Sequence, residues 1–545
     1  MRRPVVDNDD LARQVALRQE ALDCRGDRRF RAKGGDDHGK AQLVCRLPIG
    51  WLRRHGVVSV TAWRVCFSPV RGWLQRWPVG AITVTGLALT ILVISSASSS
   101  VTWLHAHAGS ARWGALLVTA ILAGLFALAR PTPVRIPLIP AASATFLGVL
   151  TLVSASWSVQ PKLTVERAIS FGAVLVVGGL LAIGSAGIAR ERERLLFGIA
   201  SGAALVAVAG LVLLVVARND AIVWWQPGSA PTRYRGFGEN ANTVALLASL
   251  ATPAAAWAAL EASTVRLRRI GLALFVLVFG SVVASESRGA IVASGIALVF
   301  FVGLLPRPIV ERAKLLGGVA ILIVLAVAIG SLRFVGNTQI QTVAASEPSV
   351  TTTTTAPATV PATSGISFTH PEGQVSPLAI YPPDRSGELG HPFLTGVGGS
   401  VSAFTSSGRI AAWRGALRTA QERPLFGFGF GTEDRVFVDR YYIFQGARPE
   451  NAYIGWLLQV GVAGLLAFAI FGLSLLWAVI RVIPRLEGQT RSAPLALAAV
   501  TLGGFLAAFF QSYVYAAGNL AVLTFWVAAL ALATTTITEE TAKRG

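Results

Sequence analysis

The chain consists largely of long apolar runs separated by short polar segments, and this alternation limits the folds available to it. Many of the runs approach the roughly 20 residues that a helix needs to cross a bilayer. Of the 545 residues, 53% are hydrophobic and only 14% are charged, which does not fit one soluble domain. We therefore predict an all-α integral membrane protein with about twelve transmembrane helices. The predicted spans lie near residues 79–98, 113–130, 138–157, 168–189, 195–217, 240–260, 270–285, 289–305, 315–333, 452–480, 493–512 and 519–535.

The distribution of Lys and Arg over the short loops predicts the orientation of these helices. If the N-terminus is cytoplasmic, the short cytoplasmic loops together with Arg130 carry 14 basic residues, and the short outer loops carry 7. Basic residues accumulate on the cytoplasmic side of membrane proteins. Both termini are therefore expected in the cytoplasm, with a multi-pass domain in the cytoplasmic membrane.

Of the net charge of +20, +8 lies in residues 1–78. Residues 1–78 contain 16 Lys/Arg, 8 Asp/Glu and four tryptophans. Basic residues interleaved with Trp beside a first span suit an anionic membrane surface better than a nucleic acid. We predict a basic cytoplasmic segment that is largely disordered or interfacial, followed by spans 1–9 within 79–333.

One connection is far longer than the others, and we predict an extracytoplasmic loop at 334–450, between spans 9 and 10. Its Thr/Pro/Ala-rich part, 349–365, cannot build a core and is expected to be disordered. The last three spans and a cytoplasmic tail fill 451–545.

A helix and a Gly-rich turn are predicted at 406–431 of this loop. Ser406 or Ser407 stands near the helix start, and Pro424 closes it. An apolar face recurs at helical spacing through Ile410, Trp413, Leu417 and Ala420. The following "FGFGFG" predicts a flexible turn, and it lacks the Gly-Lys-Ser/Thr ending of an ATP-binding P-loop.

Polar residues gather at four places on the predicted outer side. Each has an ordinary explanation: a capped helix start, an Arg that snorkels to the headgroups, or a solvated helix face. Taken together, several guanidinium groups beside amides and a carboxylate suit a diphosphate, for which Arg offers paired donors. The four clusters are Arg233, Arg235, Asn240 and Asn242; Arg288; Arg409, Trp413 and Arg414; and Arg448, Glu450, Asn451 and Tyr453.

These segments resemble the successive motifs of the O-antigen ligase and polymerase superfamily. The motifs are "RYRGFGENANTVA", "SESRGAIVA", "SGRIAAWRGAL…RPLFGFGFG" and "ENAYIGWLLQVGVAGLL". The resemblance covers roughly residues 230–480 and includes the large external loop before the last three spans. It implies transfer of a glycan from undecaprenyl diphosphate to a hydroxyl of a glycan or glycolipid acceptor, without metal or cofactor, in cell-surface polysaccharide assembly.

The resemblance also implies roles for individual residues. Arg288 and Arg409 match arginines expected to hold the diphosphate, with Trp413 four residues after Arg409. Asn240 and Asn242 match an Asn-Pro-Asn motif in which Ala241 replaces the Pro. Asn451 and Tyr453 match the polar pair that opens the span after the large loop.

The position before Asn451 departs from the family pattern. The family commonly has His there, proposed to activate the acceptor hydroxyl, and this chain has Glu450. A carboxylate can serve as a general base, and His370 or His391 on the same loop could serve instead. We expect Glu450, Arg288 and Arg409 to be catalytic, and Arg233, Arg235, Asn240, Asn242, Trp413, Asn451 and Tyr453 to bind substrate. The alternatives are a polysaccharide or lipid-carrier transporter or flippase, and a non-catalytic family member.

Overall fold

The computed structural model describes residues 78–97, 99, 101–130, 137–223, 233–238, 240–344, 409–436, 449–486, 489–519 and 521–542. Side chains are not described at 329–344, 409–412, 489 and 536–542. The expectations for the N-terminal segment, for the disordered stretch 349–365 and for the Ser406 or Ser407 helix start therefore lie outside the described residues. So do Arg448 and the two loop histidines.

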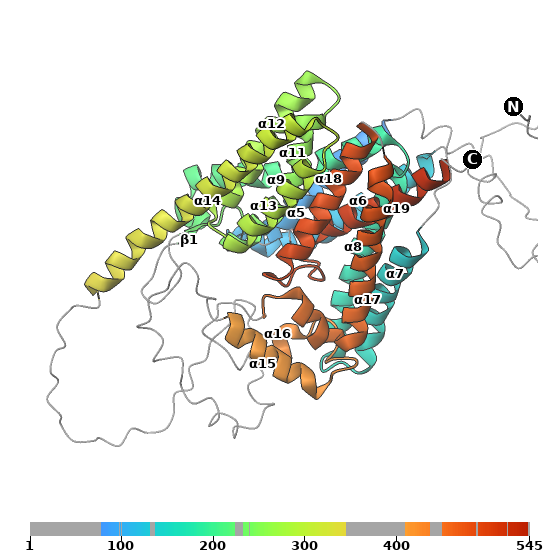
Figure 1. Cartoon of the computed structure of the whole chain (residues 1–545). Helices are drawn as coiled ribbons and strands as arrows, with labels where there is room; N and C mark the ends of the chain where they lie inside the picture. The colour runs from blue at the N-terminus through green and yellow to red at the C-terminus, as the bar shows by residue number, and fades with distance from the viewer. Residues whose placement is uncertain are drawn as a thin grey trace, which may run out of the picture. The chain divides into compact units, whose positions relative to one another are not determined.

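Every predicted span coincides with a helix (Figure 1). Nine of the described helical segments are long and apolar enough to cross a membrane by length and composition, and two shorter apolar helices, Arg288–Gly303 and Val522–Thr535, accompany them. The chain is thus a helical, multi-pass membrane protein. The helices that coincide with the predicted spans are α5 (Val79–Ala97), α6 (Thr102–Ala129), α7 (Leu138–Val153), α8 (Pro161–Ser185), α9 (Ala189–Val216), α11 (Ala241–Glu261), α12 (Val265–Ala284), α13 (Arg288–Gly303), α14 (Ile309–Ala344), α17 (Ala452–Val482), α18 (Gln489–Ala507) and α19 (Val522–Ala542).

Short elements complete the described part of the chain. They are the 3₁₀ turns η1 (Ser154–Ser156) and η3 (Ile483–Arg485), and the helices α10 (Arg218–Ala221), α15 (Arg409–Glu422) and α16 (Glu433–Val436). The strands β1 (Ile222–Val223) and β2 (Arg233–Tyr234) pair antiparallel and form the one β-sheet among the described residues.

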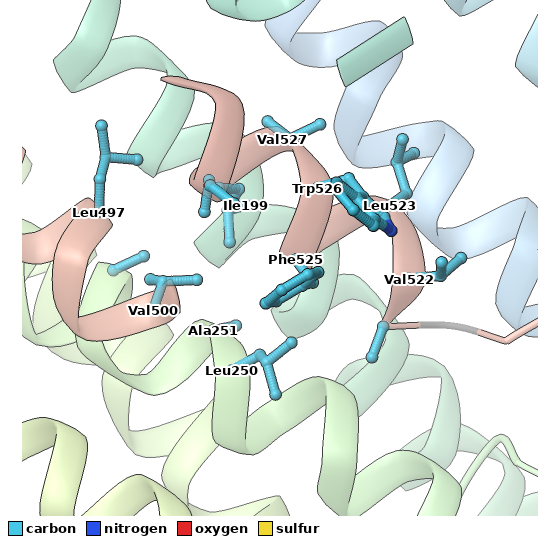
Figure 2. Close-up of a cluster of buried hydrophobic side chains, with 14 of the residues drawn as sticks. Ile199, Leu250, Ala251, Leu497, Val500, Val522, Leu523, Phe525, Trp526 and Val527 are labelled. Atoms are coloured by element: carbon cyan, nitrogen blue, oxygen red, sulfur yellow. The ribbon is translucent and has the colours of Figure 1, made fainter. Parts of the chain in front are cut away.

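Helix α11 lies at the centre of the bundle and contacts α9, α12, α13 and α18. Of its most apolar 18-residue window, 89% is buried. Lipid tails are as apolar as Leu, so membrane helices associate mainly by close packing of small residues. The sequence of α11 is accordingly rich in Ala, and at Gly271 of α12 a Cβ would collide with the Ala258 carbonyl group of α11. Figure 2 shows larger side chains of α9, α18 and α19 filling the core around Leu250 and Ala251.

Two sets of helix ends gather at opposite ends of the bundle. At one end, the Arg307 side chain just after α13 pairs at 2.7 Å with Glu261, the last residue of α11. Also at that end, Trp257 of α11 donates to the Ser492 hydroxyl near the start of α18. The start of α11, the start of α13 and the end of α18 therefore lie on the opposite side. The end of α12 and the start of α17 lie there too.

Helix α17 is broken, although its sequence predicts one continuous span. Val460 has φ −130° and ψ 15°, and Gly461 has φ 66°, so neither is helical. The Gly-rich segment 426–431, which follows α15, occupies the break. The N–H groups of Phe428 and Gly429 donate to the carbonyl oxygens of Leu458 and Gln459, and Val462 N–H donates to Pro424 O. This segment, predicted as a flexible turn, is thus fixed by backbone hydrogen bonds.

Helix α15 rests on the short first part of α17. Its buried residues Ala416 and Ala420 pack against Leu458. Leu417, predicted to belong to the packed face, is 42% exposed. The two alanines let the helices approach closely, which turns the bulkier Leu417 to the rim of the contact. In Figure 1, α15 and α16 lie beside the end of α17 that carries its N-terminus.

Candidate functional site

The first and second polar clusters meet at the turn between α12 and α13. Arg233 donates from Nε to the Ser285 carbonyl oxygen at 3.0 Å and from Nη2 to Asn242 Oδ1 at 3.0 Å. One guanidinium therefore joins the start of α11 to the turn that precedes Arg288.

The other residues of the first cluster have local partners. Arg235 donates to the carbonyl oxygens of Asp220 and Asn219, at 2.7 and 3.1 Å. Asn240 caps α11 by accepting from the Thr243 N–H at 3.0 Å. These hydrogen bonds are with α10 and with the helix start itself.

Arg288 is the first residue of α13, and its side chain is exposed. Ser287 stands at the N-cap of this helix without a side-chain capping hydrogen bond. The partial positive charge of a helix N-terminus favours anions, as does the guanidinium. This helix start differs from those of α11 and α17, which Asn240 and Asn451 cap. Arg288 and the start of α13 can together receive an anionic group.

The segment 508–519, after α18, connects this helix start to the fourth cluster. A Cβ at Gly289 would collide with the Phe510 ring, so the start of α13 packs directly against this segment. On its other side, Ala452 N–H donates to Ala508 O at 2.8 Å and Asn451 N–H donates to the Ser512 hydroxyl at 3.2 Å. Residues far apart in the chain are therefore neighbours here.

Glu450 has a strained backbone between fixed neighbours. Its φ of 48° lies in the left-handed region, which costs a residue with a side chain about 1–2 kcal/mol. Such strain persists where the surroundings determine the conformation. On one side Trp413 of α15 donates from Nε1 to the Pro449 carbonyl at 2.8 Å. On the other side Asn451 caps α17, accepting from the N–H groups of Tyr453 and Ile454.

Tyr453 is anchored rather than free to turn toward a ligand. Its hydroxyl donates to Phe505 O at 2.8 Å, and its ring lies 4.5 Å from that of Phe509. Arg409 begins α15, and its side chain lies outside the described part of the chain. We call the connected set of Arg233, Asn242, Arg288, Glu450 and Asn451 the polar band; its members are linked through Ser285 and the segment 508–519.

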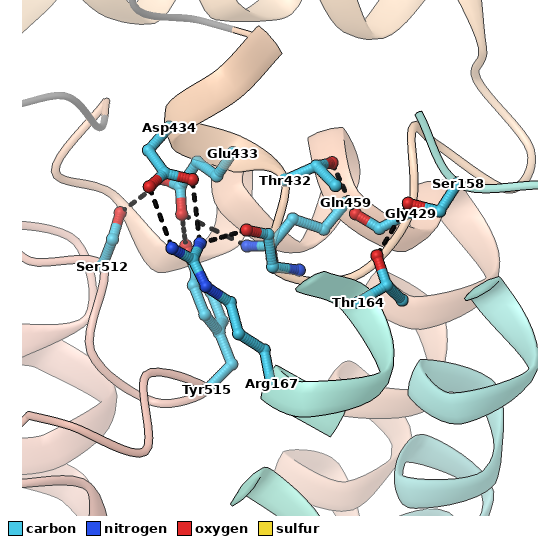
Figure 3. A network of polar contacts seen from close by, with 11 residues as sticks. Ser158, Thr164, Arg167, Gly429, Thr432, Glu433, Asp434, Gln459, Ser512 and Tyr515 are labelled. Atoms are coloured by element: carbon cyan, nitrogen blue, oxygen red, sulfur yellow. Dashed lines mark hydrogen bonds and ion pairs between the residues drawn. The ribbon is translucent and has the colours of Figure 1, made fainter. Parts of the chain in front are cut away.

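A buried network that the sequence motifs do not indicate adjoins the polar band through Ser512 (Figure 3). Glu433 is only 3% exposed, and its carboxylate accepts hydrogen bonds from Ser512, Tyr515 and Gln459 at 2.9, 2.7 and 3.2 Å. Gln459 lies at the break in α17, where its side-chain oxygen accepts from the Gly431 N–H at 2.6 Å. A polar residue inside a predicted span was the signal that could have indicated this network.

An ion pair holds the adjacent residue of α16. Arg167 of α8 pairs with Asp434 through two hydrogen bonds of 2.8 and 3.0 Å, and its Nη1 also donates to the Gly431 carbonyl. The Gly-rich segment is therefore fixed between α8 and α17.

In a comparison with protein-family models, residues 273–469 match the O-antigen ligase family (Wzy_C). A comparison with curated proteins found no match. The matched region starts in α12 and ends in the second part of α17. It includes Arg288, the Gly-rich segment, Glu450 and the break in α17, and thus three of the four motifs that carry the resemblance; the first motif, at 233–245, lies outside it. Residues 273–469 are therefore similar to the O-antigen ligase family, which supports the resemblance to the O-antigen ligase and polymerase superfamily.

Proposed function

We propose that this protein transfers a glycan from undecaprenyl diphosphate to an acceptor hydroxyl on the outer face of the cytoplasmic membrane. The observation that carries the proposal is the continuity of the polar band. Gly289, which follows the exposed Arg288, and Asn451, which follows the strained Glu450, both contact one segment, 508–519. An anion-binding group and a potential base thus belong to one site.

In this proposal Arg288 binds the diphosphate, with Arg409 of α15 as a second ligand. Their guanidinium groups offset the negative charge that develops on the leaving group. Arg233 uses two of its nitrogens on Ser285 and Asn242. We therefore assign it to support the turn that presents Arg288.

Glu450 is proposed as the general base. Its carboxylate accepts the proton of the acceptor hydroxyl while the hydroxyl oxygen attacks C1 of the donor sugar. The bond from C1 to the diphosphate oxygen breaks, its electron pair leaves with the polyprenyl diphosphate, and the configuration at C1 inverts. Both substrates are lipid-linked or lipid-adjacent glycans, which suits a site at the ends of membrane helices.

The proposed topology rests on the distribution of Lys and Arg over the short loops. The polar band lies on the extracytoplasmic side, residues 334–450 belong to the external loop, and both termini are cytoplasmic. Residues 1–78 form a basic cytoplasmic segment that associates with anionic lipid.

Transfer by the purified protein tests the function. The protein is reconstituted in nanodiscs with a synthetic polyprenyl-diphosphate glycan and a glycan or glycolipid acceptor. We expect extended acceptor and free polyprenyl diphosphate in a one-to-one ratio. Movement of intact donor across proteoliposomes without cleavage would instead identify a transporter, and binding of donor without cleavage would identify a non-catalytic member.

A further inference from the structure

The buried carboxylate of Glu433 is an unusual choice for the inside of this bundle. An ionisable group is costly to bury, and an apolar side chain would pack there at a lower cost. Glu433 instead receives hydrogen bonds from Ser512 and Tyr515 of the segment 508–519 and from Gln459 of α17. Its position thus fixes elements that are separate in sequence.

One of these hydrogen bonds continues to the polar band. Because the Ser512 hydroxyl donates to Glu433 Oε1 at 2.9 Å, its lone pairs are turned away from that carboxylate. The same oxygen accepts the Asn451 N–H at 3.2 Å. Asn451 directly follows Glu450, whose backbone is in the left-handed region. The relay therefore runs from Glu433 through Ser512 to the peptide that joins Glu450 to α17.

A second set of hydrogen bonds holds the other end of the first part of α17. Gln459 donates to Glu433 Oε2 and accepts from the Gly431 N–H. These bonds fix the last residue of the short first part of α17 relative to α16. The helix that starts at Ala452 is then held at both of its ends by groups bound to one carboxylate.

From these contacts we infer that Glu433 is a positioning residue for Glu450. It orients Ser512, which fixes the Asn451 peptide and with it the direction of the Glu450 carboxylate. The inference rests on the proposed role of Glu450 as the base. It assigns to Glu433 no contact with either substrate.

Kinetics of a double-mutant cycle test the relay. The variants are Glu433→Gln, Ser512→Ala and their combination, with transfer measured in nanodiscs over a range of donor concentrations. Misplacing a reacting group by about 1 Å can lower turnover by about 10²-fold. We expect each single variant to lower kcat by about 10- to 100-fold with little change in donor KM, because the diphosphate ligands are untouched. The combination should lose little more than either single variant, because both changes break one path.

Two controls separate the relay from a general loss of packing. Thr501→Val removes a buried hydroxyl from α18 that bonds only the Leu497 carbonyl of its own turn, so kcat should be unchanged. Asp434→Asn weakens the neighbouring ion pair with Arg167, and its effect should multiply with that of Ser512→Ala. If the effects of Glu433→Gln and Ser512→Ala also multiply, Glu433 does not act through Ser512 and the inference is overturned.

Combining Glu433→Gln with Glu450→Gln distinguishes the positioning role of Glu433 from the base role of Glu450. If the base is Glu450, Glu450→Gln alone lowers kcat strongly and Glu433→Gln adds little to it. A strong loss in Glu450→Gln that Glu433→Gln deepens by its full single-variant factor overturns only the positioning role. Full turnover in Glu450→Gln alone overturns the base assignment, and the positioning role with it.

Discussion

Arg233 and Arg235 belong to one short motif but reach different parts of the molecule. If the strand continued, residues two apart would point to the same face. The strand ends at Tyr234, however, and the chain turns at Gly236, where φ is 55°. Arg233 consequently binds the turn before Arg288, and Arg235 binds the residues of α10. Sequence spacing alone could not separate their roles.

We predict that Arg233→Ala impairs transfer more than Arg235→Ala. Loss of Arg233 leaves the Ser285 carbonyl and Asn242 without a charged donor, each contact contributing about 1.5–3 kcal/mol. The expected result for Arg233→Ala is a transfer rate reduced by about tenfold or more, and for Arg235→Ala a lower thermal midpoint with transfer retained in the folded fraction. Rates and thermal unfolding are measured on matched preparations. Equal transfer rates in the two variants would contradict the assignment.

Glu450 is the residue whose chemistry departs most from the family pattern. Glu450→Gln keeps the shape of the side chain but removes its ability to take a proton, so transfer should fall by about 10²–10⁴-fold while donor binding persists. Glu450→His should retain substantial activity, with the pH optimum moved toward the imidazole range near about pH 6.5. Transfer is measured against pH for the three forms, with exposed Glu422→Gln on α15 as the control. An unchanged pH profile with full activity in the Gln form would move the base to His391 or His370.

At the scale of elements, the break in α17 is the feature that sequence analysis did not predict. The residues around Val460 and Gly461 are mostly apolar, with Gln459 as the polar exception, so hydropathy and length favour one long span. What interrupts the helix is a partner from elsewhere in the chain. The Gly-rich segment supplies backbone donors and acceptors to the groups that the break leaves open, which a membrane requires of any irregular backbone.

Gly461→Ala should therefore disrupt this junction. A Cβ at this position would collide with the Leu425 carbonyl, and the φ of 66° costs a residue with a side chain about 1–2 kcal/mol. We expect a lower thermal midpoint and a reduced transfer rate. The matched control is Gly179→Ala in α8, where a Cβ meets nothing within 4 Å and Ala is the better helix former. If both variants behave like wild type, the junction does not hold the site.

At the scale of the whole molecule, the positions of the helices could be predicted because length and apolarity decide them. The ends were less predictable: α6 begins at Thr102, eleven residues before the predicted span, because its first turns are amphipathic rather than apolar. Four motifs on one side indicated the site, but the Glu433 network was missed. Its members are scattered over α16, α17 and the segment 508–519, and their proximity depends on tertiary packing.

The orientation of the bundle in the membrane remains a prediction of the loop charges. Reporter fusions at Pro377 and after Gly545 test it, with alkaline phosphatase active only outside and a fluorescent reporter active only inside. We expect phosphatase activity at Pro377 and fluorescence after Gly545. A cytoplasmic signal at Pro377 would place the polar band on the wrong side for an external glycan.

The central claim is that the polar band binds a diphosphate and transfers the glycan attached to it. The most direct measurement is the transfer rate of purified Arg288→Ala beside Arg269→Ala, which removes an exposed arginine at the opposite end of α12. Loss of charge-assisted contacts worth about 1.5–3 kcal/mol each should abolish measurable transfer in Arg288→Ala. Arg288→Lys should restore it only partly, because a point charge cannot replace the paired donors. Wild-type transfer by Arg288→Ala, with Arg269→Ala equally active, would contradict the claim.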